Sequence, residues 1–531
     1  MTAIVTTPFR VVNAQNFKNN VAANSVYVAI GKSDAWSTTT SDLTDTTAFT
    51  PSDRIDDLSE AYQNMIGMKK VLSTDVSHVV PRHTWTSGTS YIAWDSDDAT
   101  IYDKAFYIIS SEFKVYKCIT AGGGASTVEP THINTNPTAE SDGYFWKYLF
   151  TVTVTDAEKF LTISYMPVNT LNMPSTSVTS GASSSSTSVT LTASNEFIAV
   201  GQLVTGAGVA ANATVATISG TALTLSADST IANAVTLTFG RFADTDVNYT
   251  NQTAQINSRD SSTAAGIERI EVTAGGTGYT SKPTVTVTGD GTSATVVAAQ
   301  VTLTSEAVTA IALTTKGTNY TVVDVTITGG GGSDATARAV IAPPLGHGVD
   351  PTSELGAFYV GINTQLSGTE TGDLTVGNDF RQISLIKNPK QFGSDATAIA
   401  TTLKARRSLV LDGNATMTGF VVDQLLVGSS SSAKAYIAEI DTSNKVLYYY
   451  QNSKTGYIPF VSGDTVTGTL PSGGSAALNT SSSTTWYGNS PTNAFGPEVT
   501  LNSGQLIFLE NRDPINRSSS QIEDIKLIIE F

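Results

Sequence analysis

The chain has 531 residues, more than a single hydrophobic core ordinarily organises, so we expect about two to four compact units. Charged residues make up 14 % of the sequence and the formal net charge is −16, which argues against a surface that binds nucleic acid. Hydrophobic residues reach 40 %, enough to build cores, and this excludes global disorder. Because Ser, Thr, Gly and Ala fill the space that charges leave, the composition favours short strands and many turns.

The composition also bears on the compartment. Cys118 is the single cysteine, so no disulfide can form within the chain, and its place in "VYKCIT" predicts a buried thiol in a strand. The first residues lack a basic region followed by an apolar stretch, and we expect no signal peptide. No apolar run approaches the roughly 18 residues that span a bilayer, so we expect no membrane span. These patterns predict folding in a reducing cytoplasm.

The first elements alternate between strands and helices. Apolar residues recur at helical spacing between residues 52 and 71, so we expect a helix there with Ser52 as its N-cap. Strands are expected at 25–32, 105–110, 113–120 and 144–154. The last of these strands is apolar on both faces, which indicates a central place in a sheet. A helical turn is expected at 155–161, with Thr155 or Asp156 as its cap.

A change of composition at Pro174 opens a different kind of sequence. Short alternating strands separated by turn residues predict a small β-sandwich or barrel over about 175–240. An internal repeat follows, with copies that begin at Gly266 and Ala307. Matching positions of the two copies are Ile270 and Ile311, Tyr279 and Tyr320, and Ala294 and Ala335, an offset of 41 residues that slips by one inside the second copy. Because two copies are too few for a solenoid, we expect them to pair with each other as one β unit.

The remaining sequence is again rich in strand patterns. We expect a strand at 377–389, closed by Pro389, and a further β-rich stretch over 419–468. A polar segment at 472–497 is expected to be a linker, and two strands follow it at the end of the sequence.

Between these two strands lies "ENRDPINR", which gathers the carboxylates of Glu510 and Asp513 and the guanidinium groups of Arg512 and Arg517. Its Asp-Pro pair favours a turn, with one strand ending at Glu510 and the next starting near Gln521. We interpret these residues as a structural joint, whose charges pair across the turn or with a neighbouring subunit.

No catalytic, metal-binding or cofactor-binding residues are predicted. Zinc is not expected, because ligand-spaced partners are missing for the four histidines, His78, His83, His132 and His347. The acidic run at Asp95 begins like a calcium loop, but Ala99 and Phe106 occupy positions that need oxygen ligands. Glycine-rich segments are followed by strands and not by the helix of a phosphate-binding loop. A pair of carboxylates brought together from distant segments, as in a glycosidase, stays open as an alternative.

Several separated segments resemble the family of baseplate wedge proteins encoded by gene eight of T4-like bacteriophages. They are "VAIGKSDAWS" (28–37), "VVPRHTW" (79–85), "SDGYFWKYLF" (141–150), "FRQISLIKNP" (380–389) and the two terminal strands (503–531), in the family's order. The resemblance implies an α+β fold, mainly β with minor α. Its β-sandwich core is expected to be discontinuous in sequence and to carry inserted small β domains, which exposed loops tolerate.

The resemblance also implies a division of the chain and a role. Core segments are expected at 1–172, 346–398 and 496–531, and inserted β domains at 173–265, at 266–345 (the repeat pair) and at 399–495, the last including the linker. The family role is that of a structural, non-enzymatic subunit of the baseplate wedge of a contractile tail, without a cofactor. Expected partners are other wedge subunits and a second copy of the chain in a homodimer. The expected location is the virion, after synthesis in the host cytoplasm.

An alternative from a different class is a host-surface tail protein whose β-rich inserts bind carbohydrate. Such proteins usually present clustered aromatic rings as stacking platforms. The inserts offer Tyr279, Tyr320 and the tyrosine run at 448–450. This scattered supply weakens the alternative without removing it.

Overall fold

The computed structural model describes residues 3–37, 45–169, 175–195, 197–243, 245–461, 463–469, 475–480 and 495–531. Two compact units are formed, each from separated segments. The first comprises Met1–Asn19, Ser77–Gly361 and Ile528–Phe531, and the second comprises Asn20–Val76 and Ile362–Leu527. Most of the linker expected at 472–497 lies outside the described residues.

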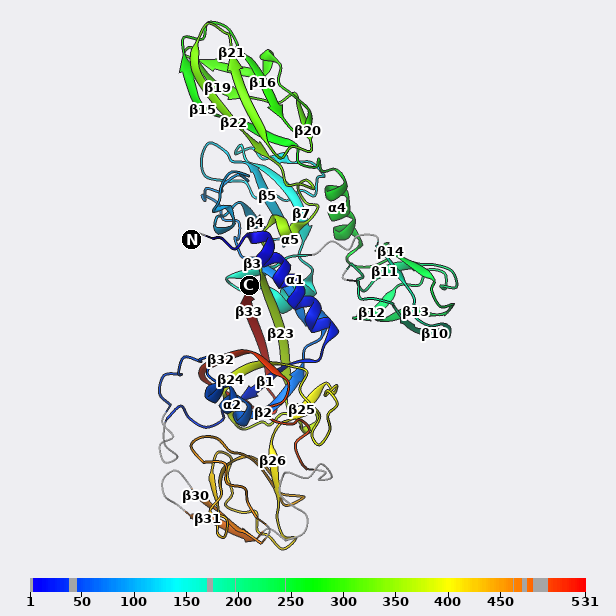
Figure 1. Cartoon of the computed structure of the whole chain (residues 1–531), viewed down its shortest axis with the longest axis vertical. Helices are drawn as coiled ribbons and strands as arrows, with labels where there is room; N and C mark the ends of the chain where they lie inside the picture. The colour runs from blue at the N-terminus through cyan, green and yellow to red at the C-terminus, as the bar shows by residue number, and fades with distance from the viewer. Residues whose placement is uncertain are drawn as a thin grey trace. The chain divides into compact units, whose positions relative to one another are not determined.

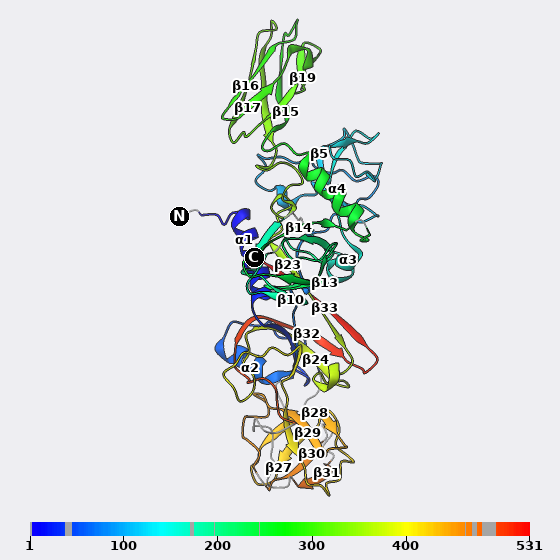
Figure 2. The same cartoon turned by 90° about the vertical axis from the view of Figure 1, so that its right-hand side faces the viewer.

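The expected fold class is confirmed, because antiparallel sheets dominate and helices are few (Figure 1). The α-helices of the described residues are α1 (Thr7–Ala23), α2 (Ile55–Asn64), α3 (Val154–Phe160), α4 (Tyr249–Asp260) and α5 (Pro351–Glu354). The sequence patterns indicate neither α1 nor α4, since α1 is rich in Asn and α4 in Asn and Thr, which are weak helix formers. Tertiary packing stabilises α4, which lies against the four-stranded sheet of the first unit (Figures 1 and 2) and buries Ala254 and Ile256.

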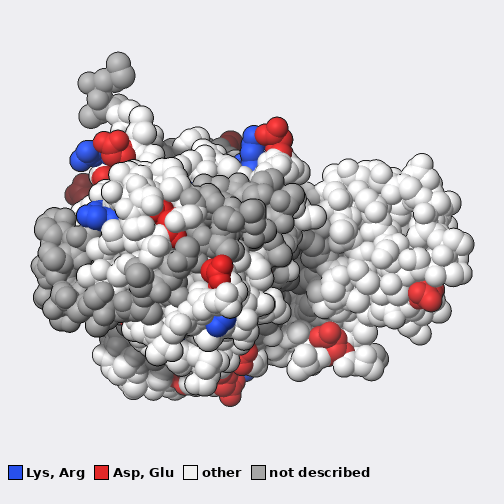
Figure 3. Space-filling view, turned by 90° about the horizontal axis from the view of Figure 1, so that it is seen from below, with Lys and Arg blue, Asp and Glu red and all other residues white. Residues whose placement is uncertain are grey.

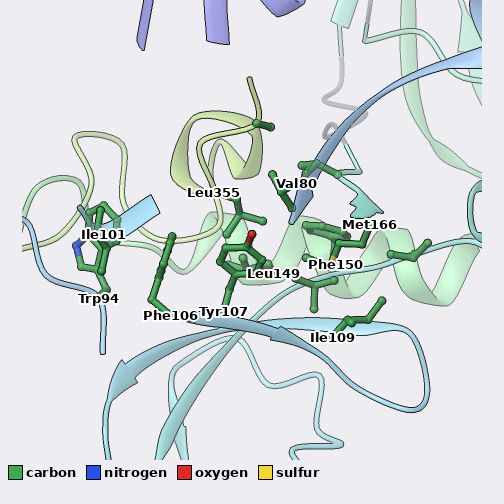
Figure 4. Packing of buried hydrophobic residues seen from close by; sticks show 14 of the residues in the cluster. Val80, Trp94, Ile101, Phe106, Tyr107, Ile109, Leu149, Phe150, Met166 and Leu355 are labelled. Atoms are coloured by element: carbon green, nitrogen blue, oxygen red, sulfur yellow. The ribbon is translucent and has the colours of Figure 1, made fainter. Parts of the chain in front are cut away.

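The main core of the first unit lies against a four-stranded antiparallel sheet. In spatial order its strands are β4 (Tyr107–Ile109), β5 (Lys114–Thr120), β7 (Phe145–Thr151) and β6 (Thr138–Ala139). β7 is interior, as its two apolar faces predict. Tyr107, Leu149 and Phe150 from this sheet pack toward Leu355 and Val80 (Figure 4). Full burial of such a side chain contributes about 1.5–3 kcal/mol.

Residues 175–242 form a sandwich of two three-stranded sheets. One sheet holds β10 (Ser183–Thr190), β13 (Ala222–Ile231) and β12 (Val215–Ser219), and the other holds β11 (Gln202–Thr205), β14 (Thr236–Phe242) and β9 (Ser175–Val178). Alternate side chains, including Leu223, Leu225, Leu237 and Phe239, share one core. This is the arrangement in which inward apolar residues alternate with outward polar ones.

The repeat pair forms a β structure of its own, which we call the tandem module (residues 267–341). Its strands before the turn at 305–306 are β15 (Ile267–Thr277), β16 (Thr284–Gly289), β17 (Thr292–Thr295) and β18 (Val301–Thr304). Those after the turn are β19 (Ala307–Ile311), β20 (Thr315–Thr318), β21 (Val323–Thr328) and β22 (Ser333–Ile341). Apolar side chains of both copies share one core, which makes the two copies a single folded body.

The second unit is built around a five-stranded antiparallel sheet. In spatial order its strands are β25 (Thr402–Lys404), β2 (Met65–Lys70), β1 (Val26–Gly31), β24 (Asp379–Lys387) and β32 (Gln505–Asn516). Every residue of β1 is buried, and so is the interior of β24. Burial on both faces explains why β1 appears in the sequence as a continuous apolar run.

A six-stranded sheet follows in the same unit, and we call residues 407–469 and 475–480, which hold its strands, the C-terminal β subdomain. In spatial order the strands of this sheet are β26 (Arg407–Val410), β29 (Val446–Tyr450), β28 (Lys434–Asp441), β27 (Leu425–Gly428), β30 (Thr465–Thr469) and β31 (Ser475–Thr480). Its core includes Leu426, Ile437 and Leu447, all completely buried. The subdomain therefore has a hydrophobic core separate from that of the five-stranded sheet.

The boundaries between the two units fall inside regular elements. They divide α1, β3 (Val76–Pro81), β23 (Tyr359–Ser367) and β33 (Ile522–Glu530). In the first unit β3 pairs with β8 (Tyr165–Pro167). The chain thus passes from one unit to the other through a helix and strands and not through loops.

Two expectations about helices are corrected by the structure. The helix expected at 52–71 ends at Asn64, and the next six residues form β2. Hydrogen bonding to β1 and β25 on either side outweighs a helical periodicity that is only a weak prior. The N-cap of α2 is Arg54 and not Ser52. For α3 the cap is Thr153, whose hydroxyl accepts from the Asp156 backbone N–H at 3.0 Å, so this helix starts earlier than expected.

Candidate assembly joints

Three segments that are far apart in the sequence become neighbouring strands in the second unit. β24 lies between β1 and β32, and the register places Ile30, Ile383 and Glu510 in one row across the three strands. Each strand comes from one of the segments on which the sequence resemblance was based (28–37, 380–389 and 503–531). Since these strands hydrogen bond to one another, the three segments form one framework.

The Asp-Pro pair of "ENRDPINR" lies inside β32 and not at a turn, which corrects the expectation from sequence. β32 continues to Asn516, and the turn follows at 517–521. Pairing with β24 is interrupted by a β-bulge between Asn511 and Ile515. β32 is the last strand of its sheet, and a proline, which has no N–H, is tolerated at an edge or a bulge.

Arg517 is buried, and its charge is balanced within the chain. Its Nε lies 2.9 Å from Oε2 of Glu523 across the terminal turn, and the two side chains are only 1 % and 6 % exposed. Its other nitrogens donate to the carbonyl oxygens of Thr375, at 2.7 Å, and Gly368, at 2.8 Å. One carboxylate and two carbonyls together fix the guanidinium plane, and with it the start of β33.

The other residues of the motif lie apart from Arg517 and closer to solvent. Nε of Arg512 is 3.7 Å from Oε1 of Glu510, and their side chains are 37 % and 35 % exposed. Asp513 is exposed. The carbonyl of Arg512 accepts a hydrogen bond from Nε1 of Trp36 at 2.9 Å. Of the four predicted residues, Arg517 therefore belongs to an internal ion pair, and the other three form one accessible group.

Sequence reasoning missed a tighter arginine–carboxylate pair beside the bulge. Arg381 of β24 binds both oxygens of Asp45, through Nε at 2.7 Å and Nη2 at 2.6 Å, and also contacts Asp379 at 2.9 Å. Hydrogen bonding to Arg381 is the main reason why the pKa of Asp45 lies below its ordinary value. The sequence signal that could have revealed this pair is an arginine inside the predicted strand "FRQISLIK", because a buried arginine needs a partner.

A buried charge cluster attaches the C-terminal β subdomain to the end of β1. Asp34 is 1 % exposed, and its Oδ2 lies 2.5 Å from Nζ of Lys32 and 2.7 Å from Nζ of Lys454. Its Oδ1 accepts from Nδ2 of Asn452 at 3.1 Å and from the hydroxyl of Tyr450 at 3.3 Å. The first two residues belong to the family-like segment 28–37, and the other three belong to the subdomain.

The pKa values show how this cluster keeps its charges. Burial raises the pKa of Asp34, but Lys32 and Lys454 outweigh burial, and the net pKa lies below the ordinary value. Burial lowers the pKa of Lys32. Asp423, which accepts a hydrogen bond from the Ser33 hydroxyl at 2.5 Å, differs because burial raises its pKa to about 6. Since removing one partner leaves a buried charge unpaired, the cluster fixes the subdomain in place.

A second set of charges holds the tandem module within the first unit. Arg338 of β22 reaches both oxygens of Asp95, at 2.8 Å through Nη1 and 2.5 Å through Nη2, and hydrogen bonding to Arg338 holds the pKa of Asp95 below its ordinary value. Asp95 is the first residue of the acidic run that begins like a calcium loop, and its carboxylate binds Arg338. Nε1 of Trp94 donates to the carbonyl of Ile341 at 3.1 Å.

Buried ionisable groups lie next to this contact. Nζ of Lys117 is 3.1 Å from Oε2 of Glu354 and 3.7 Å from the centroid of the Trp94 ring. The ring nitrogens of His347 lie 3.8 Å from Glu354 and 3.6 Å from Glu268. Burial lowers the pKa of His347 to about 3, so its ring is neutral near pH 7. Within the described residues, no group of three or more His, Cys, Asp or Glu side chains is placed to hold a metal ion.

The tyrosines on which the carbohydrate-binding alternative depends are buried. Tyr279 and Tyr320 are 4 % and 5 % exposed, and the three tyrosines at 448–450 are buried in β29. A ring inside a hydrophobic core presents no face on which a sugar could stack. The alternative therefore loses its main support in the sequence.

Charges are sparse on the part of the surface that Figure 3 shows. Lys and Arg are few and scattered there, and they do not gather into the basic patch that nucleic acids bind. Among the helices that the structure describes, none has the length and apolar character needed to span a membrane.

Comparison with known proteins identifies a related family for the N-terminal part. Residues 3–121 match the family described as "Bacteriophage T4, Gp8". "Baseplate wedge protein gp8" of Enterobacteria phage T4 is 25 % identical over 187 residues, which cover 28 % of this chain and 55 % of the relative. The chain thus spans about half the length of this relative. The resemblance is confirmed as a distant and partial homology, and the matched residues include Asp34, Asp95 and Lys117 of the two charge clusters.

Proposed function

Because residues 3–121 make this chain a distant and partial homologue of phage T4 gp8, we propose that it is a structural subunit of the baseplate wedge of a contractile phage tail. The family match carries the proposal. The five-stranded sheet supports it, since β1 lies in the matched span and β24 and β32 beside it are further family-like segments. The proposed location is the virion, after synthesis in the host cytoplasm.

The proposed action is linkage through protein–protein contacts. The matched family is one of structural baseplate proteins and not of enzymes. Proposed partners are other wedge subunits and a second copy of the chain in a homodimer. We assign one contact to the accessible group of Glu510, Arg512 and Asp513, because Arg517 is already satisfied inside the chain.

Incorporation into wedges tests this function. Purified chain is mixed with wedge subunits of the same phage, and assembly is followed by sedimentation and electron microscopy. Arg512→Glu should weaken incorporation by roughly 2–5 kcal/mol of association free energy if the ion pair becomes desolvated at the contact. Lys390→Glu is the matched control, because it reverses a charge in an exposed pair with Asp395, and it should assemble like the wild type.

The outcomes of this experiment separate the function from the surface. A wild-type chain that enters no wedge complex would reject the proposed function. If the wild type and both variants assemble equally well, the function stands and the assignment of the contact to Arg512 is wrong. A glycan array of the full chain tests the host-binding alternative, and we expect no bound sugar.

A further inference from the structure

The two copies of the repeat are interlocked, because the strands of one copy pair with the strands of the other. In the tandem module every pairing between strands joins a strand before the turn at 305–306 to one after it: β15 with β19 and β22, β16 with β21, β17 with β20, and β18 with β19. Neither copy forms a sheet from its own strands in this part of the structure. Each copy therefore supplies the hydrogen-bonding partners that the other lacks.

Equivalent residues of the two copies meet each other, which reveals an internal two-fold relation. Ile270 pairs with Ile311, its counterpart at an offset of 41 residues. Thr286 pairs with Thr326, its counterpart where the offset has slipped by one. A position that pairs with its own equivalent lies on a two-fold axis, as at the interface of a symmetric dimer. The module thus has the internal geometry of a homodimer made from one chain.

Away from this axis, pairs between β15 and β22 recur as equivalent pairs between β20 and β17. Gly275 pairs with Ala335, and the equivalent residues Lys316 and Ala294 pair in the same way. The backbone N–H of Tyr279 donates to the carbonyl of Glu306 at 2.9 Å, and that of Tyr320 donates to the carbonyl of Ala265 at 3.0 Å. These donors and acceptors are related by the same offset of 41 residues.

The two copies also approach each other closely at two equivalent glycines, one in each copy. Gly276 and Gly317 have φ angles of 64° and 62°, in the region that glycine adopts without strain. A Cβ on Gly276 would lie 2.2 Å from the carbonyl oxygen of Ser333, and one on Gly317 would lie 2.4 Å from that of Thr292. Each glycine therefore lets the backbone of the opposite copy come close.

We propose that each repeat is a self-complementary half-module whose binding partner is a second copy of the same repeat. Tandem duplication closes within one chain an interface that, in a chain with a single repeat, joins two molecules. This property is independent of the role proposed above, because it rests on the strand pairing alone. It also means that the strand-pairing surface of the module is already occupied in the native protein.

A single-repeat form of the chain tests this inference. Deleting residues 266–306 joins Ala265 directly to Ala307. Ala265 occupies the position equivalent to Glu306, so the remaining copy is still preceded by a residue at that position. Two such chains should pair about the two-fold axis and bring their Thr326 residues together. Thr326→Cys in this form should then form a disulfide between chains under a mild oxidant such as diamide, because Cys118 is buried.

Two controls make the cross-link specific. In the full chain Thr326 faces Thr286, so Thr326→Cys alone should give no cross-linked dimer at the same concentration. In the single-repeat form Thr328→Cys, an exposed position on the same strand that pairs with the equivalent of Thr284 and not with itself, should also fail to cross-link. A folded single-repeat chain whose Thr326→Cys variant remains uncross-linked overturns the proposal.

A second variant decides the case in which the single-repeat form does not fold. Residues 270–294 of the full chain are replaced by the sequence of residues 311–335, which has the same length, so that both copies become alike. Self-complementary halves should give a chain with the thermal midpoint and cooperativity of the wild type. Loss of the cooperative transition would show that the two copies are specialised for each other and would overturn the proposal.

Discussion

Arg517 and Arg512 are five positions apart but have different environments, which predicts different energetic roles. Arg517→Ala leaves Glu523 buried without its cation and removes two hydrogen bonds to carbonyls. Breaking a buried pair in this way costs roughly 3–5 kcal/mol. Urea unfolding of the purified chain should therefore show a large loss of stability.

The matched control is Arg512→Ala in the same strand. Its pair with Glu510 is longer and about one-third exposed, so its loss should change the free energy of unfolding by only about 0–1 kcal/mol. Equal losses for the two variants would contradict the division of the motif into an internal pair and an accessible group.

Asp423 should make the stability of the second unit depend on pH. Burial raises its pKa from 3.8 to about 6, so the folded state holds the proton more tightly than the unfolded state. The stabilisation from this residue is therefore fully present below about pH 4 and is lost as the pH rises through 6. Asp423→Asn should remove this slope and gain roughly 2–3 kcal/mol over the wild type at pH 8, since one pKa unit is about 1.4 kcal/mol.

Urea unfolding at a series of pH values from 4 to 8 measures this effect. The Asn side chain can still accept the hydrogen bond from Ser33, so the variant changes the charge and keeps the contact. If the profiles of the two proteins run parallel, the pKa of Asp423 is not raised in the folded state.

At the scale of elements, β2 shows how a neighbour overrides local preference. Gly67 sits in the middle of this strand, where a Cβ would lie 2.4 Å from Cδ2 of Leu374 and 3.0 Å from the carbonyl oxygen of Asp373. Gly67→Ala should therefore destabilise the second unit by roughly 1–3 kcal/mol through overpacking. Gly124→Ala, where a Cβ would meet nothing within 4 Å, should stay within about 0.5 kcal/mol of the wild type in thermal unfolding.

A helix at 65–70 would give the opposite outcome. In a helix, alanine is more favourable than glycine by about 1 kcal/mol, so Gly67→Ala would stabilise the chain. The sign of the change in the thermal midpoint therefore distinguishes the strand from the helix that the periodicity predicts.

At the scale of the whole molecule, the sandwich is the part that should be removable. β9 and β14 pair, with Ser175 opposite Phe239, so the chain enters and leaves the sandwich at neighbouring places. Replacing residues 175–243 with a short Gly/Ser linker should leave a soluble remainder that unfolds cooperatively, since closing such a loop costs little. Calorimetry of the shortened chain provides the measurement.

Extending the same excision to residue 265 should fail, because it removes α4. Ser258 of this helix donates to the carbonyl of Tyr148 at 2.6 Å, and its own carbonyl accepts from Nζ of Lys147 at 2.8 Å. Loss of α4 uncovers β7 and takes acceptors from a buried lysine. The longer excision should lower the thermal midpoint or cause aggregation, and equal tolerance of both would show that α4 belongs with the sandwich.

The sequence by itself determined several features of this protein. Its composition of small β-favouring residues predicts a mainly β fold, and the two-faced apolar run at 144–154 predicts the interior strand β7. Separated motifs gave the family resemblance, and the offset of 41 residues gave the repeat whose copies pair. These features can be predicted from the sequence because each depends on the order of residues within one segment or on direct similarity between segments.

Only the tertiary structure decided which residues become partners. Residues 65–70 form the strand β2, and β32 continues past an Asp-Pro pair at a bulge on the edge of its sheet. Arg517 is buried, whereas Arg512 is accessible. The tertiary structure also brought Lys454 to Asp34 across more than four hundred residues of sequence. The physical reason is that hydrogen bonding between strands and the burial of a charge depend on neighbours far away in the chain, and periodicity within one segment carries no information about them.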